Sequence, residues 1–212
     1  MVYRLLLNES TSKIIDVIYK YFPADISYNS FRYKISKQNI QKHIKYIYAK
    51  YSGKAAYWHR KMRIIFDNCE VVQWTDFETG DCYQYKVLLH ENHDLMDDDV
   101  ELILSLGGER KDLRIYISVL GKFYIYYVVV TKYDNSSDDI GYIDRWEFSN
   151  DFEIPENFTH NIKVLEEFME QKGYRKVTQA EAEFVMDNLE TEYIKKGKVR
   201  VFDCIFTQID GL

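Results

Sequence analysis

The sequence predicts an α+β protein with an antiparallel meander sheet of about six strands, flanked by N-terminal and C-terminal helices. Two observations carry this prediction. Apolar residues follow the helical 3.6-residue period in the first and last thirds of the 212 residues, and alternate with the period of a strand in the middle. The expected strands are joined by short turns, which connect antiparallel strands because parallel pairs need long crossovers.

Three helices are expected in the first third. The first begins at Ser10 or Thr11, ends at Pro23, and has an apolar face formed by Ile14, Val17, Ile18, Tyr21 and Phe22. The stripe of the second helix, which Gly53 can end, is Ile40, Ile44, Ile47, Tyr48 and Tyr51. A third, less regular stripe is Ala55, Trp58, Met62, Ile65 and Phe66.

After Asp67 the apolar period changes to two residues. The predicted strands span 69–75, 82–90, 102–106, 113–119, 123–131 and 141–148. The run at 123–131 is apolar throughout and is typical of a central strand covered on both sides.

The last third returns to helical spacing. One helix carries Ile162, Leu165, Phe168 and Met169 and stops at Gly173. A second begins at the capping-box pair Thr178 and Glu181 and continues through Val185, Met186 and Leu189 on one face. A final strand is expected at 199–206. We expect a single domain over 1–212, with soft boundaries near 67 and 149–160 and a sheet covered on one face.

The charge is distributed unevenly along the chain. Residues 26–66 contain ten Lys and Arg and no Asp or Glu. Residues 1–75 carry thirteen basic and five acidic side chains, net +8, whereas residues 76–212 carry fifteen and twenty-nine, net −14, which sum to −6. Such asymmetry indicates contact with a polyanion, contact with a basic partner, or neutralisation of one half by the other.

Acidic clusters in the second half suggest a protein interface. Carboxylates that steer association, next to rings that anchor it, can hold a basic protein. The leading hypothesis is therefore a non-enzymatic protein-interaction module, in its most concrete form a bacterial inhibitor or immunity-type protein that masks a basic toxin or nuclease. The residues expected to bind this partner are Asp97, Asp98, Asp99, Asp138, Asp139 and Trp146.

The basic segment 26–66 supports an alternative, a nucleic-acid-binding module. Cations neutralise phosphates and interleaved rings can stack on bases, as single-stranded nucleic acid requires. The residues assigned to this role are Lys42, Lys45, Arg60, Lys61 and Trp58.

Motifs for chemistry are missing from the sequence. It has no G-x-S-x-G elbow and no Gly-rich phosphate loop, and His90 and His93 in a polar loop with Asp94 lack the spacing of a zinc helix. Cys69, Cys82 and Cys204 are interpreted as reduced, unreactive thiols of a cytoplasmic protein. We therefore predict no catalytic residue, metal or cofactor, and no membrane association, because no run of about eighteen apolar residues occurs. An enzyme whose site assembles only on folding stays open as a third class.

Overall fold

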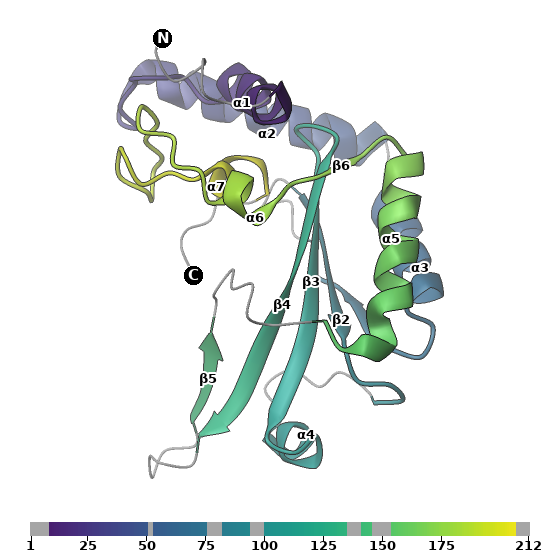
Figure 1. Cartoon of the computed structure of the whole chain (residues 1–212). Helices are drawn as coiled ribbons and strands as arrows, with labels where there is room; N and C mark the ends of the chain where they lie inside the picture. The colour runs from purple at the N-terminus through teal and green to yellow at the C-terminus, as the bar shows by residue number, and fades with distance from the viewer. Residues whose placement is uncertain are drawn as a thin grey trace.

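The computed structural model describes residues 9–50, 53–75, 82–93, 100–134, 141–145 and 154–206. It has a mixed α+β architecture, with one mostly antiparallel sheet and several helices (Figure 1). Among the described residues, no helix combines the length and apolar character needed to cross a membrane.

The sheet is built mainly from strands that are neighbours in sequence. β1 (Val71–Gln73), β2 (Cys82–Leu88), β3 (Glu109–Ser118), β4 (Phe123–Asp134) and β5 (Gly141–Arg145) pair antiparallel in chain order. The two-residue β6 (Arg175–Lys176) pairs with β4 in parallel. The expected six-strand antiparallel meander is therefore only partly right: its consecutive core is present, but the additional strand is parallel and comes from the C-terminal region.

Two predicted strands are helices. Residues 102–106 fall within and just after α4 (Val100–Ser105), where Leu102 and Ile103 are consecutive buried positions, and Gly108, with a positive φ of 89°, donates its N–H to Ile103. Residues 199–206 form α7 (Val201–Ile205), which starts where the Arg200 N–H donates to the Asp203 carboxylate over 2.8 Å. Periodicity failed there because every residue from 201 to 206 is buried.

The longer helices agree with the sequence. α1 (Glu9–Tyr21), α3 (Lys54–Ile65) and α5 (Thr159–Gln171) carry the predicted stripes, and a 3₁₀ turn (Glu156–Phe158) precedes α5. α2 (Phe31–Lys50) buries Ile40 and Ile44 of its stripe, whereas the Tyr48 side chain and Tyr51 lie outside the described part. α6 (Gln179–Ala182) is far shorter than expected, because Val185 leaves the helix to form an isolated antiparallel bridge with Arg200.

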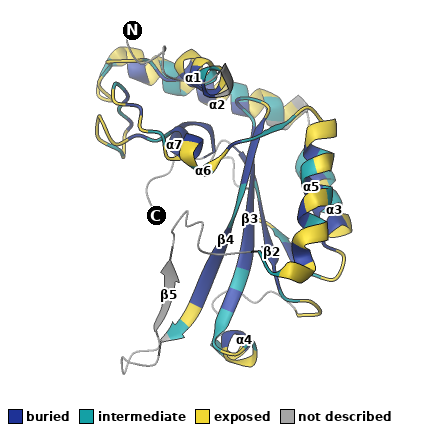
Figure 2. Cartoon of the chain, in the orientation of Figure 1, coloured by how far each residue is buried: buried dark blue, intermediate teal, exposed yellow. Residues whose placement is uncertain are grey.

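The sheet separates two apolar cores. Alternate residues of β3 point to opposite faces, so Tyr116 joins the core beneath α1, α2 and α7, whereas Ile115 and Ile117 join the core beneath α3 and α5. β3 and β4 are consequently buried over most of their length (Figure 2). The expectation of one covered face is wrong, because β4 is apolar on both sides and each fully buried large side chain stabilises by about 1.5–3 kcal/mol.

The turn between β3 and β4 reaches the N-terminal helices. A Cβ on Gly121 would lie 2.6 Å from the Phe123 ring and 3.4 Å from Val17 of α1, so glycine permits this close packing. The His43 ring of α2 lies with Nε2 3.2 Å from the Val119 carbonyl oxygen. The hairpin thus extends from the middle of the sheet to the underside of α1 and α2.

A buried carboxylate joins α1 to α6. Glu181 completes the predicted capping box with Thr178, accepts from the Arg175 guanidinium at 3.0 Å, and accepts from the Thr11 hydroxyl at 3.1 Å. Burial raises the pKa of Glu181, but the hydrogen bonds from Thr178 and Arg175 outweigh it, so the pKa lies below its ordinary value. Ionised Glu181 therefore stabilises the fold at neutral pH, and this contribution is lost as the pH falls through the lowered pKa.

We predict that Glu181→Ala lowers the free energy of unfolding by about 2 kcal/mol at pH 7, because it leaves buried donors without their acceptor. The matched control is Glu183→Ala, an exposed neighbour whose loss should change stability by no more than about 0.5 kcal/mol. Urea unfolding followed by circular dichroism measures both. The Glu181→Ala deficit should shrink in acid, and equal effects of the two substitutions would contradict this role.

Candidate interaction surface on the second helix

The residues of the two sequence hypotheses fall differently in the structure. The hypothesis that acidic loops bind a basic partner stays a prediction, because its residues lie outside the described part of the chain. They are Asp97, Asp98, Asp99, Asp138, Asp139 and Trp146. In the basic segment, Lys42, Lys45 and Arg60 are exposed and Lys61 is half-buried.

Trp58 does not fit the role of a base-stacking ring. Its side chain is 1% exposed, and it packs edge-on against Phe168 at 5.7 Å and Tyr174 at 5.5 Å between ring centroids. These contacts place it in the core between α3 and α5. The assignment of Trp58 to nucleic-acid binding is therefore not supported, because a ring so enclosed has no face to offer a ligand.

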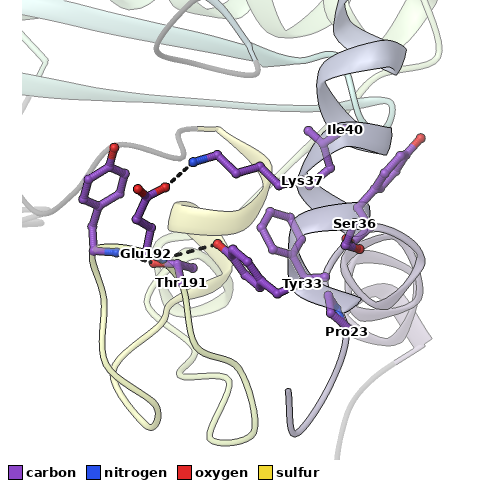
Figure 3. A pocket seen from close by; sticks show the side chains of 10 residues that line it. Pro23, Tyr33, Ser36, Lys37, Ile40, Thr191 and Glu192 are labelled. Atoms are coloured by element: carbon purple, nitrogen blue, oxygen red, sulfur yellow. Dashed lines mark hydrogen bonds and ion pairs between the residues drawn. The ribbon is translucent and has the colours of Figure 1, made fainter. Parts of the chain in front are cut away.

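α2 has an inner face held by the rest of the protein. Tyr33, Ile40 and Ile44 are buried along it. Lys37 forms an ion pair with Glu192, and the Glu192 N–H donates to the Tyr33 hydroxyl over 3.3 Å (Figure 3). The hydrogen bond to Glu192 raises the pKa of Lys37. The space enclosed at this junction is about 20 Å³, room for a water molecule but not for a substrate.

The outer face of α2 carries cations. Arg32, Lys34, Lys42 and Lys45 are exposed there, and none of the four forms an ion pair with a carboxylate of the described residues. Since residues 26–66 contain no Asp or Glu, the helix itself supplies no compensating charge. Among the described side chains, the ion pair of α2 is the inward one, from Lys37.

Apolar side chains are interleaved with these cations. Phe31 is 79% exposed, Ile35 42% and Tyr46 56%. Phe31, Ile35, Lys42 and Tyr46 lie at i, i+4, i+11 and i+15. This spacing places them on one stripe of the helix, opposite the buried residues. Single exposed apolar residues are ordinary, but an aligned set flanked by cations is typical of an interaction surface. We call the residues Phe31, Arg32, Lys34, Ile35, Lys42, Lys45 and Tyr46 the outer face of α2.

A second group of charges is buried within the sheet. Asp112 accepts from Arg110 Nη2 at 3.1 Å and has Lys86 Nζ at 3.7 Å, and the rings of Trp74 lie against Lys86 and Arg114. Burial raises the pKa of Asp112, while the charges of the surrounding cations oppose that rise. Lys86, Arg110 and Arg114 each make at least one interaction besides these contacts. We interpret the group as a brace across β2 and β3, which sequence reasoning missed because the cations occupy ordinary polar positions of alternating strands.

Three of the five histidines hydrogen-bond to backbone groups. Besides His43, His59 Nε2 lies 2.8 Å from the Val71 carbonyl oxygen, and His90 Nε2 accepts from the Lys111 N–H over 3.1 Å. Burial first, and the neighbouring His93 second, lower the pKa of His90, which keeps this ring neutral at pH 7. These contacts account for the rings structurally.

An open groove of about 490 Å³ runs beside His90. Its polar groups bind one another: Glu91 accepts from Asn157 at 3.1 Å, and Glu109 holds Lys132 at 2.9 Å and Lys111 at 3.3 Å. In the part of the chain that the structure describes, no three His, Cys, Asp or Glu side chains gather as they would around a metal ion. Asp94, the third member of the loop considered in the sequence, lies outside that part.

Comparison with known proteins gives no family: no protein-family model matches the chain, and no curated protein or solved structure is significantly similar to it. The interpretation of the outer face of α2 rests on its own geometry.

The three cysteines form no disulfide in the structure; Cys82 and Cys204 are buried and Cys69 is half-buried. Burial, with the charges of Glu91 and Asp67, raises the pKa of Cys69 from 9.0 to about 11.

We predict that Cys69 in the folded protein reacts with iodoacetamide at pH 7.5 about a hundredfold more slowly than in urea, because the thiolate fraction falls with that pKa shift. Mass spectrometry of the labelled peptides measures it, with Cys69→Ser as control. Labelling as fast as in urea would reopen the enzyme class.

Proposed function

We propose that this protein is a non-enzymatic interaction module that binds an acidic protein segment through the outer face of α2. The observation that supports it is the combination of four cations without described carboxylate partners and three exposed apolar side chains on that single face. Interface cores are enriched in aromatic residues and Arg, whereas plain solvated helix faces mix charges of both signs.

Apolar chemistry favours a protein partner over nucleic acid. Phe31 and Ile35 are adjacent on the helix at i and i+4, and an aliphatic side chain gains most against another apolar surface. A segment carrying Asp or Glu beside Leu- or Phe-like side chains complements both parts of the face. It would dock as an amphipathic helix docks in a groove or along a partner helix.

The nucleic-acid alternative loses Trp58 as its stacking residue. Exposed cations suit phosphates, but Trp58 is enclosed in the core and the bases would have to stack elsewhere. Oligonucleotide binding is therefore the competing outcome of the experiment below.

The inhibitor or immunity-type role with a basic partner belongs to the same class of function but uses a different surface. Its residues lie outside the described part of the chain, so it stays a prediction beside the one argued for α2.

Selection from a random peptide display library tests the proposal without a known partner. We expect the wild-type protein to enrich peptides in which Asp and Glu alternate with apolar residues. A triple variant with Lys34→Glu, Lys42→Glu and Lys45→Glu should bind a selected peptide with at least tenfold lower affinity, because like charges then oppose docking. Fluorescence anisotropy measures this affinity. Phe31→Ala should weaken it by a similar factor, since truncation of a central anchor costs about 1–2 kcal/mol or more.

The matched control is charge reversal at exposed lysines of other elements, Lys163, Lys195 and Lys198, which should leave peptide affinity within about twofold. Enrichment of basic peptides that bind wild type and the α2 variant equally would place the interface on the acidic loops instead. Saturable binding of a dT oligonucleotide, with no peptide enriched, would favour the nucleic-acid alternative.

A further inference from the structure

Four lysines from three separate segments are linked by contacts around Tyr57: two lie near its ring, and the other two follow through Lys122. Lys54 and Lys61 belong to α3, Lys122 lies in the turn between β3 and β4, and Lys172 caps the end of α5. The ring is that of Tyr57 on α3. We call these five residues the Tyr57 cluster. The cluster cannot be predicted from the sequence, because Lys122 and Lys172 are far from the basic segment along the chain.

Two of the ammonium groups lie close to the Tyr57 ring. Lys61 Nζ lies 6.0 Å and Lys172 Nζ 5.9 Å from the centroid of Tyr57, within reach of cation–π attraction. Lys122 Nζ donates to the Lys172 carbonyl oxygen over 3.2 Å, which holds its side chain against the end of α5. The cations are thus fixed by different contacts and still share one patch of surface.

Three of the four lysines have no carboxylate partner among the described residues. Lys61, Lys122 and Lys172 form no ion pair with any carboxylate in the described ranges. Burial and then the charge of Lys122 lower the pKa of Lys54, so the two ammonium groups are close enough to repel. Like charges held close together cost free energy in the ligand-free protein, and a bound anion would relieve that cost.

We infer that the Tyr57 cluster is a binding site for a multiply charged oxyanion of the phosphate type. Lysine ammonium groups are compact charges that neutralise phosphate oxygens individually, whereas single carboxylates are better matched by the planar fork of arginine, which this cluster lacks. Several converging cations suit a ligand with several negative charges. A soluble polyphosphate and the backbone of a nucleic acid both supply that chemistry. The inference is independent of the outer face of α2.

Isothermal titration with sodium tripolyphosphate at low ionic strength tests this site. Wild type should show saturable binding of one ligand per chain, and a variant with Lys61→Gln, Lys122→Gln and Lys172→Gln should bind at least tenfold more weakly. The matched control, Lys163→Gln with Lys195→Gln and Lys198→Gln, removes as many exposed charges elsewhere and should stay within twofold. Tripolyphosphate should also raise the thermal midpoint of wild type and of the control, but not of the cluster variant.

Ligand-free protein gives an independent readout. Lys122→Gln should move the pKa of Lys54 back toward its ordinary value, because it removes the charge of Lys122, whereas Lys163→Gln should not. The charge reversals on α2 should leave tripolyphosphate affinity unchanged, which separates this site from the peptide surface.

A dT oligonucleotide in a parallel titration identifies the source of the oxyanion. Binding that is lost in the cluster variant supports the site with nucleic acid as its source, and binding of tripolyphosphate alone supports a soluble polyphosphate. No saturable binding of either probe by wild type overturns the inference. So does equal weakening in the cluster and control variants, since it would show only the effect of overall charge.

Discussion

Burial of β3 and β4 on both faces is the constraint on which the structure depends. β4 carries apolar side chains on both faces and cannot expose either to water, so each side of the pair needs a covering layer. One layer forms where α1, α2 and α7 pack against Tyr116, Phe123 and Ile125, and the other where α3 and α5 pack against Ile115 and Ile117. The hairpin turn then reaches α1 at Gly121 and α2 at Val119.

Both proposed sites follow from this arrangement. α2 is fixed by its inner face, through Ile40, Ile44 and the contacts of Tyr33 and Lys37 with Glu192, so its outer face is not needed for packing. The Tyr57 cluster exists because the hairpin turn, which carries Lys122, comes to the end of α5 beside α3. Surfaces that packing does not require are free to carry charge for other purposes, at some cost to stability.

Much of the fold could be predicted from amphipathic periodicity. The stripes of α1, α3 and α5 are confirmed, as are the buried Ile40 and Ile44 of α2, and β2, β3 and β4 lie where strands were predicted. Prediction failed at α7, where consecutive buried residues carry no period, and at α4, where Leu102 and Ile103 suited either structure. The capping box at Thr178 was found from spacing, whereas its bonds to Thr11 and Arg175 depend on tertiary contact.

The candidate sites were less predictable, since charge along the sequence does not show where side chains point. The segment 26–66 correctly marked Lys42 and Lys45 as surface cations, but Trp58 proved to be core and Phe31 and Ile35 proved to be exposed. A long-range cluster such as Lys61 with Lys122 and Lys172 has no signal in one sequence.

Native-state hydrogen exchange in increasing urea measures the central constraint most directly. If the doubly covered hairpin holds both cores, the slowest amides of α1, of α3 and of β3–β4 should exchange with the same opening free energy and the same urea dependence, that of global unfolding. Opening of α1, α2 and α7 as a separate unit, at lower free energy and with its own large urea dependence while β3, β4, α3 and α5 stay protected, would contradict this account.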